Sequence, residues 1–234
     1  MARMIMANLR SSRQLGVVAS LVFASLVCVL LVVARAAYTL TGAYADLLWN
    51  LFLAWLPLLI ALLIYRLHGR SSRFGWVLIG ICAFFWLLFL PNAPYLLTDI
   101  IKLRVRGYVP IWYDLILLIS FAWTGTLLGL TSLYLMQQLV RRSVGAAISW
   151  IFAVLVVALS GFGVYLGRFP RFNSWDLFTS PQGLLSQVWQ QFSDPVANWH
   201  AFAFSGLFSL VFISVYLVFV AMTRWPLDLQ QAKS

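Results

Sequence analysis

The sequence predicts an all-α fold: a polytopic transmembrane helix bundle of about six spans, with short amphipathic interfacial helices on its outer face. Hydrophobic residues make up 63% of the 234 residues and charged residues only 9%, whereas about a quarter of residues are charged in soluble domains. Several apolar stretches reach the roughly 20 residues needed to cross a hydrocarbon core. We expect one integral membrane domain over residues 1–234, with spans near 15–34, 47–65, 74–90, 112–137, 144–166 and 199–222.

The first apolar stretch follows three arginines, as a secretory signal peptide would. Its run of about 19 apolar residues is longer than the 7–15 residues of a signal-peptide core. We therefore expect it to remain as a membrane anchor.

The distribution of basic residues indicates membrane topology rather than nucleic-acid binding. The formal net charge is +10, but Lys and Arg fall almost entirely in short segments between the apolar stretches. The clusters HGRSSR, at residues 68–73, and RRS, at residues 141–143, are typical of cytoplasmic loops. With both termini in the cytoplasm, ten of the sixteen Lys and Arg residues lie inside and six outside. We expect this orientation, and no nucleic-acid partner.

The third span ends in FLPNAPYLLTDIIKL, where two prolines stand three positions apart. A residue that precedes proline is pushed out of the helical region, so Leu90 and Ala93 are expected to be extended. Pro94 suits the first turn of a new helix, where its missing N–H would have no partner. We predict that the span ends within two residues of Leu90 and that Pro94–Leu103 forms a separate helix.

That second helix carries its polar residues on one face. Tyr95, Thr98, Asp99 and Lys102 follow the helical spacing i, i+3, i+4 and i+7, and leucines and isoleucines cover the opposite side. This pattern is typical of an amphipathic helix in the membrane interface. Such a helix either anchors a loop or forms the wall of a site at the outer face.

The second polar stretch is SGFGVYLGRFPRFNSWDLF, at residues 160–178. Ser160, Gly163 and Gly167 share one helical face, which favours close helix packing in a membrane. Arg168 and Arg171 follow at the end of this span.

A short helix is predicted directly after these arginines. Asn173 can cap it, with Asp176 at the third position as a carboxylate variant of the capping box. At the start of the fourth span, Asp114 has a favourable interaction with the helix N-terminus. We predict a further surface helix from Pro181 to Phe192.

These residues define a candidate polar cluster at the outer face. We predict that Asp99 lies close to Arg168 or Arg171, because a carboxylate near lipid needs a cation. Asp99 and Asp176 are the candidate catalytic residues. The candidate ligand-binding residues are Asn92, Tyr95, Asp99, Asp114, Arg168, Arg171, Asn173 and Asp176. No Cys/His spacing predicts a metal site and no glycine-rich phosphate loop occurs, so we expect neither metal nor cofactor.

Three blocks carry a resemblance to a known family: LPNAPYLLTDI, WYDLILLISFAWTG and SGFGVYLGRFPRFNSWDLF. Together they cover about residues 85 to 180, and the combination of NAPY, TD, GRF and NSWD is specific. In these blocks the chain resembles the bacterial membrane proteins called domain of unknown function 1361. The resemblance implies a multi-span inner-membrane protein and supplies no activity.

Three classes of function remain open from the sequence. We favour a structural, assembly or partner-binding role, in which the polar cluster pairs internally or docks a membrane-protein partner. An outer-leaflet enzyme would use Asp99 or Asp176 as a base and the arginines to hold a lipid phosphate or other anion. A carrier or ligand-binding protein would use the broken third span and Asn92 at its outer mouth. Membrane lipids are the expected surroundings in every case.

Overall fold

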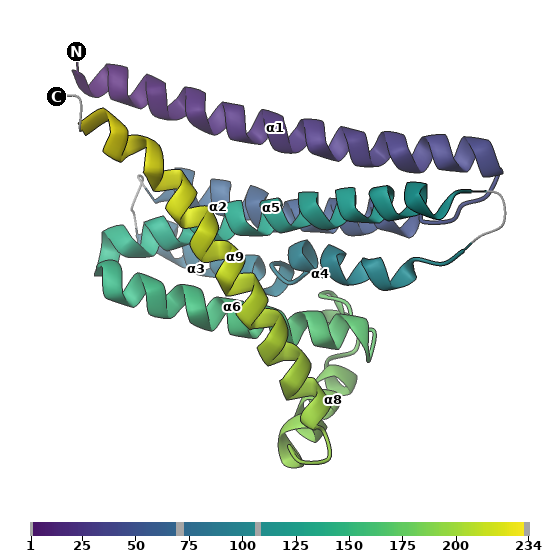
Figure 1. Ribbon diagram of the computed structural model, residues 1–234. Helices are drawn as coiled ribbons and strands as arrows, with labels where there is room; N and C mark the ends of the chain where they lie inside the picture. Colours follow the sequence, from purple (N-terminus) through teal and green to yellow (C-terminus); the bar gives the residue numbers. More distant parts are fainter. Residues whose placement is uncertain (1, 69–72, 106–108, 232–234) are drawn as a thin grey trace.

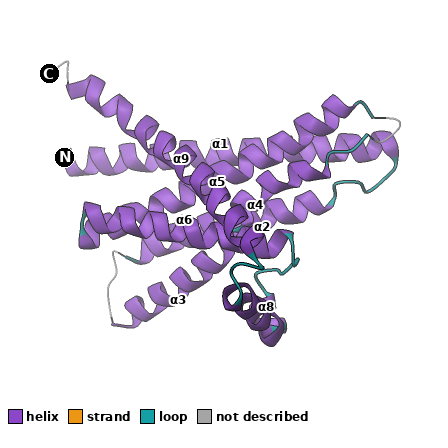
Figure 2. Ribbon diagram, turned by 60° about the horizontal axis from the view of Figure 1, so that its bottom comes forward, coloured by secondary structure: helices purple, strands orange, loops and turns teal. Residues whose placement is uncertain are grey.

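The computed structural model describes residues 2–68, 73–105 and 109–231, and these residues form helices without any β-strand (Figure 2). The helices are α1 (Ala2–Thr39), α2 (Asp46–Leu67), α3 (Arg73–Phe89), α4 (Asn92–Thr98), the 3-10 helix η1 (Asp99–Lys102), α5 (Ile111–Val144), α6 (Ala146–Arg168), α7 (Asp176–Thr179), α8 (Pro181–Ser193) and α9 (Trp199–Gln231).

Six segments of the described chain are long and apolar enough to cross a membrane, as predicted. They are Leu15–Thr39, Asp46–Leu67, Gly75–Lys102, Ile111–Val144, Ala146–Arg168 and Trp199–Thr223. The fourth segment continues past its predicted end to Val144. The third segment includes α4 and η1, although we predict from the sequence that the span ends before them.

Helix α5 is the centre of the bundle. It contacts α1, α2, α4, α6 and α9, and α9 crosses α6 at a steep tilt (Figure 1). The two ends of the chain lie at the same end of the bundle, opposite the connection between α1 and α2 (Figure 1). Of the basic cluster HGRSSR, residues 69–72 lie outside the described part of the chain.

The buried apolar side chains form two clusters, one toward each end of the bundle. One joins α1, α2, α4 and α5 around Leu47 and Phe121, and the other joins α2, α3, α5, α6 and α9 around Trp86 and Tyr216. Lipid tails are as apolar as these side chains, so close packing rather than water exclusion holds the helices together.

The break in the third span is present, and α3 ends at Phe89 as predicted. The prediction that Ala93 is extended is wrong, because Ala93 lies inside α4, which begins at Asn92. Pro94 is then the third residue of α4, still within the first turn, where its missing N–H breaks no helical hydrogen bond. The chain therefore bends tightly instead of leaving the bundle.

The segment after the break is packed inside the helix bundle. The break lies beside the middle of α5. A Cβ atom added at Gly125 would lie 2.5 Å from the Ala93 carbonyl oxygen, and one added at Gly129 would lie 3.2 Å from the Ala93 Cβ. Helix α4 is packed between α2, α5 and α6. Thr98 at the end of α4 and Asp99 at the start of η1 are buried, whereas Ile101 in η1 is 71% exposed. The polar face thus points into the bundle, as is usual for ionisable groups in membrane helices.

The small residues of α6 allow it to approach the break closely, as the sequence predicted. A Cβ at Gly163 would lie 2.6 Å from Pro91 Cγ, and one at Gly167 would lie 3.2 Å from the Tyr95 ring. Both distances are shorter than ordinary van der Waals contact. These two glycines therefore position α6 against the break at Pro91 and against α4.

Candidate functional site

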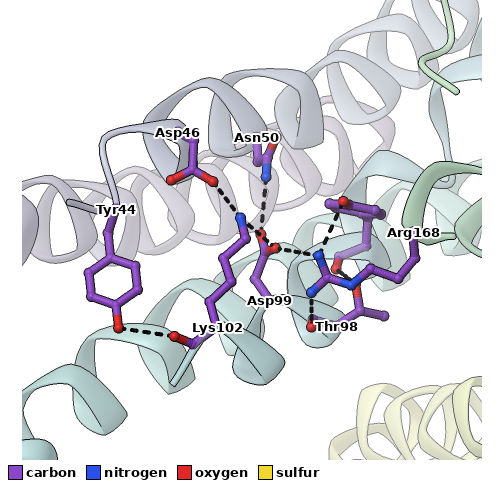
Figure 3. A network of polar contacts seen from close by, with 8 residues as sticks. Tyr44, Asp46, Asn50, Thr98, Asp99, Lys102 and Arg168 are labelled. Atoms are coloured by element: carbon purple, nitrogen blue, oxygen red, sulfur yellow. Dashed lines mark hydrogen bonds and ion pairs between the residues drawn. The ribbon is translucent and has the colours of Figure 1, made fainter. Parts of the chain in front are cut away.

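A buried carboxylate lies at the centre of a polar network at one end of the bundle (Figure 3). Asp99 begins η1 and is 0% exposed. Its Oδ1 lies 2.8 Å from Lys102 Nζ and 3.2 Å from Arg168 Nη1. Its Oδ2 accepts a hydrogen bond of 3.0 Å from Asn50 Nδ2. The predicted contact between Asp99 and Arg168 is present, and α2, η1 and α6 meet at this carboxylate.

The two cations of the network make further contacts that fix their positions. Lys102 Nζ also pairs with the carboxylate of Asp46 at the start of α2. Arg168 Nη1 lies 3.4 Å from the Tyr95 hydroxyl, and Nη2 donates to the Thr98 carbonyl. The guanidinium carbon lies 5.3 Å from the centre of the Tyr95 ring.

We call Asp46, Asn50, Asp99, Lys102 and Arg168 the Asp99 network. Its two carboxylates and two cations leave it neutral in sum. Because removing charges from water is costly unless they are paired, this arrangement allows Asp99 to remain buried.

A second buried ion pair joins α1 to α5. Arg35 Nε lies 2.6 Å from Asp114 Oδ1, and Arg35 Nη2 lies 3.0 Å from Oδ2. The Tyr44 hydroxyl lies 3.3 Å from both Asp114 Oδ2 and the Lys102 carbonyl oxygen, and so connects this pair to the Asp99 network. Asp114 is thus held in an ion pair of its own, one hydroxyl group away from the Asp99 network, and its role in lining a ligand site stays a prediction.

The break itself is capped by two side chains. Asn92 Nδ2 donates to the Phe89 carbonyl at 3.0 Å and to Ser174 Oγ at 2.9 Å. Ser174 Oγ in turn donates to the Leu88 carbonyl at 3.1 Å. Since the last carbonyls of a helix have no partner within it, these side chains satisfy two carbonyls at the C-terminal end of α3. This role explains why an amide side chain stands between Pro91 and Pro94.

The chain after α6 leaves the helical conformation. Arg171 has a left-handed backbone with φ of 64°, and it has no ion-pair partner among the described residues. Asp176 Oδ2 accepts the Asn173 N–H at 2.7 Å and Oδ1 lies 3.1 Å from Thr179 Oγ1. Helix α7 begins at Asp176 with Trp175 as its N-cap, so the prediction that Asn173 caps this helix is wrong, and only the carboxylate contact of the predicted capping box is present. That Asp176 lines the same region as Asp99 stays a prediction.

A cavity of about 700 Å³ opens beside the Asp99 network, and we call it the basic pocket. Four cationic side chains and no carboxylate are among its lining residues. These residues are Tyr95, Ile101, Lys102, Arg104, Gly167, Arg168, Phe169, Arg171 and Asn173.

A second cavity of about 390 Å³, which we call the apolar cavity, lies between α3, α4, α6 and α8. Leucines, phenylalanines and Pro91 make up most of its wall. Tyr95, Gly167 and Asn173 line both cavities, so the two adjoin along these residues. Asn92 lines only the apolar cavity.

Several residues at this end were not among the sequence candidates. Lys102 stands three positions after Asp99, and this ion-pair spacing on a helix would have indicated its role. Asn50 lies one turn after Asp46 on the same face of α2. Arg35 and Arg104 carry no local signal, because their neighbours come from distant parts of the chain.

The geometry limits the chemistry that this end can perform. Both candidate bases have hydrogen-bond partners: Asp99 is enclosed by three side chains, and the Asp176 carboxylate contacts the Asn173 N–H and the Thr179 hydroxyl. Among the described residues, no group of three or more His, Cys, Asp or Glu could hold a metal ion. The remaining chemical feature of this end is the group of cationic side chains that line the basic pocket. Such side chains can bind an anion.

Comparison with protein families gives a match over most of the chain. A family model described as "Protein of unknown function (DUF1361)" matches residues 49–215, more than two thirds of the chain. No curated protein and no solved structure matches the chain. The matched range contains the broken span, the Asp99 network except Asp46, and the lining of both cavities. The chain therefore belongs to the DUF1361 family of proteins of unknown function.

Proposed function

We propose that the protein binds an anionic ligand in the basic pocket. The observation that carries this proposal is the excess of positive charge there. Lys102 and Arg168 are balanced by Asp46 and Asp99. Arg104 and Arg171 also line the pocket, and neither has an ion-pair partner among the described residues. A guanidinium group forms bidentate hydrogen bonds with phosphate and carboxylate.

Two details support a binding role over a purely structural one. The backbone of Arg171 is left-handed, a conformation that costs a bulky L-residue energy and is often retained at functional sites. The Nε of Arg168 is buried and has no hydrogen-bond partner among the described residues. A purely structural cluster gains nothing from either feature.

The Asp99 network supplies the fixed wall of this site. A closed, neutral network holds Arg168 in place, so its guanidinium needs no reorganisation when a ligand arrives. The structural role that we favour from the sequence thus suits the Asp99 network, and ligand binding suits the basic pocket beside it.

We further propose that the basic pocket faces the extracytoplasmic side of a bacterial inner membrane, with both termini in the cytoplasm. The basic clusters near residues 68–73 and 141–143 support this orientation, because they favour the cytoplasm. A reporter fused after Ser234, which lies outside the described residues, tests it. Activity only outside the cytoplasm would contradict the orientation.

Binding is tested on the full-length protein in mild detergent, titrated calorimetrically with glycerol 3-phosphate. We expect saturable binding that weakens as salt is added. Arg171→Gln and Arg104→Gln should each weaken it by about tenfold or more, since a hydrogen bond to a charged group contributes roughly 1.5–3 kcal/mol.

The matched control is Arg141→Gln, an exposed arginine at the far end of α5. It makes the same change in net charge and should leave binding unchanged. Equal losses in all three variants, or no binding by the wild type, would contradict the proposal.

A further inference from the structure

The apolar cavity adjoins the basic pocket without sharing its charge. Its wall holds Phe84, Leu87, Leu159 and Leu166 among other apolar side chains, and the basic side chains of the neighbouring pocket are absent from its lining. Its volume of about 390 Å³ is within the range of small-ligand sites, about 300–1,000 Å³. A purely polar anion would leave this space unused.

The polar side chains at the break already use their donors. Asn92 and Ser174 both line the apolar cavity, yet their donors are used by the Phe89 and Leu88 carbonyls. The break in the third span therefore creates space without adding free donors from these two side chains. Such a cavity favours a hydrocarbon occupant.

Helix α8 separates the apolar cavity from the surroundings of the bundle, and it lies at the bundle's edge (Figure 2). Leu184 and Val188, one turn apart, line the cavity. On another face Leu185 is 62% exposed and Trp189 is 73% exposed. Exposed tryptophan and leucine on a short amphipathic helix are typical of the membrane interface. One face of α8 thus borders the cavity while another faces lipid.

We infer that the basic pocket and the apolar cavity are the two parts of one site for an anionic lipid. The phosphate group binds at Arg104 and Arg171, and a segment of hydrocarbon chain occupies the apolar cavity beside α8. Tyr95, Gly167 and Asn173 line the passage between them. This inference rests on the proposed function and adds the class of ligand. Its entry route is lateral, from the bilayer past α8.

The test compares three soluble probes on the full-length protein in mild detergent. Glycerol 3-phosphate carries the charge alone, dihexanoylphosphatidic acid adds two short chains, and dihexanoylphosphatidylcholine keeps the chains but is zwitterionic. We expect dihexanoylphosphatidic acid to bind at least about tenfold more tightly than either of the others.

A matched pair of variants on α8 assigns that gain to the apolar cavity. Leu184→Trp fills the cavity and should abolish the tenfold advantage while leaving glycerol 3-phosphate binding unchanged. Leu185→Trp makes the same change at the adjacent, exposed position and should leave the binding of both probes unchanged. Should Leu184→Trp not fold, Val188→Phe adds less volume to the same wall and should reduce the advantage in the same direction.

The outcomes separate this inference from the proposed function. Equal affinity for glycerol 3-phosphate and dihexanoylphosphatidic acid would overturn the inference and leave anion binding intact. Equal affinity for the two dihexanoyl lipids would overturn the requirement for an anionic headgroup. If dihexanoylphosphatidic acid keeps its tenfold tighter binding in the cavity-filling variants, its hydrocarbon chains bind outside the apolar cavity, and the inference is overturned. If no probe binds, the proposed function itself fails.

Discussion

Arg35 and Asp114 form an ion pair in which both side chains are almost completely buried, with 2% and 1% of their surface exposed. The pair joins α1 to α5 across 79 positions of sequence. The span Leu15–Thr39 of α1 is otherwise largely exposed, because only 17% of its 18-residue apolar segment is buried inside the protein. This ion pair is therefore a principal fixed point between α1 and the bundle.

Removing one partner of this pair should destabilise the protein strongly. Arg35→Gln or Asp114→Asn leaves the other charge buried and unpaired, so we expect the free energy of unfolding to fall by about 3–5 kcal/mol. Chemical unfolding in mild detergent measures the loss. The double variant Arg35→Met, Asp114→Leu removes both charges and should recover most of it. A loss below about 1 kcal/mol in the single variants would show that the pair is not a fixed point.

Asp99 and Arg168 should be coupled in stability. Asp99→Asn and Arg168→Gln each disrupt the same contact, so the double variant should lose less than the sum of the single losses, by about 0.5–3 kcal/mol. A double-mutant cycle by thermal unfolding measures this coupling free energy. The pair Asp99 and Arg141 is the control, since Arg141 is at the opposite end of α5 and should be additive. Strict additivity of Asp99→Asn with Arg168→Gln would mean that their contact contributes nothing.

The elements that could be predicted from the sequence are those with a local signal. The lengths of the apolar stretches predict the six spans, and the two prolines predict the end of α3 near Leu90, where the structure ends it at Phe89. The contact of Asp99 with Arg168 followed from a general need, because a carboxylate in lipid surroundings requires a cation. The small residues of α6 likewise predicted a close helix contact, which Gly163 makes with Pro91.

Other features could not be predicted because the local pattern has more than one explanation. A polar stripe on a short helix has the same spacing whether it faces water or the interior of a bundle, so the stripe does not show that α4 and η1 pack inside the bundle. Asp114 had a sufficient local explanation at a helix N-terminus, and nothing near it in sequence indicates Arg35. Arg171 follows Arg168 at helical spacing, but its left-handed backbone ends that periodicity.

The cap of the broken span should contribute measurably to stability. Asn92→Ala removes the donor to the Phe89 carbonyl and leaves Ser174 with one partner fewer, so we expect a loss of about 1–3 kcal/mol. Ser174→Ala frees the Leu88 carbonyl and should be partly non-additive with it. Thermal unfolding measures both. As a control, Ser186→Ala affects an exposed hydroxyl on α8 and should shift stability by less than about 0.5 kcal/mol. An equally small shift for Asn92→Ala would show that lipid or water satisfies the carbonyl instead.

The close approach of α6 to the break predicts opposite effects of the same substitution at two glycines. A Cβ at Gly163 would lie 2.6 Å from the Pro91 ring, whose rigid atoms cannot rotate away, whereas Gly80 in α3 has nothing within 4 Å of its position. Gly163→Ala should therefore cost about 1–3 kcal/mol through overpacking. Gly80→Ala should gain up to about 1 kcal/mol, because alanine loses less backbone freedom in a helix. Unfolding of both variants in the same detergent measures the contrast. A gain at Gly163 as well would mean that α6 and the broken span can separate without cost, and that the wall shared by the two cavities is not fixed.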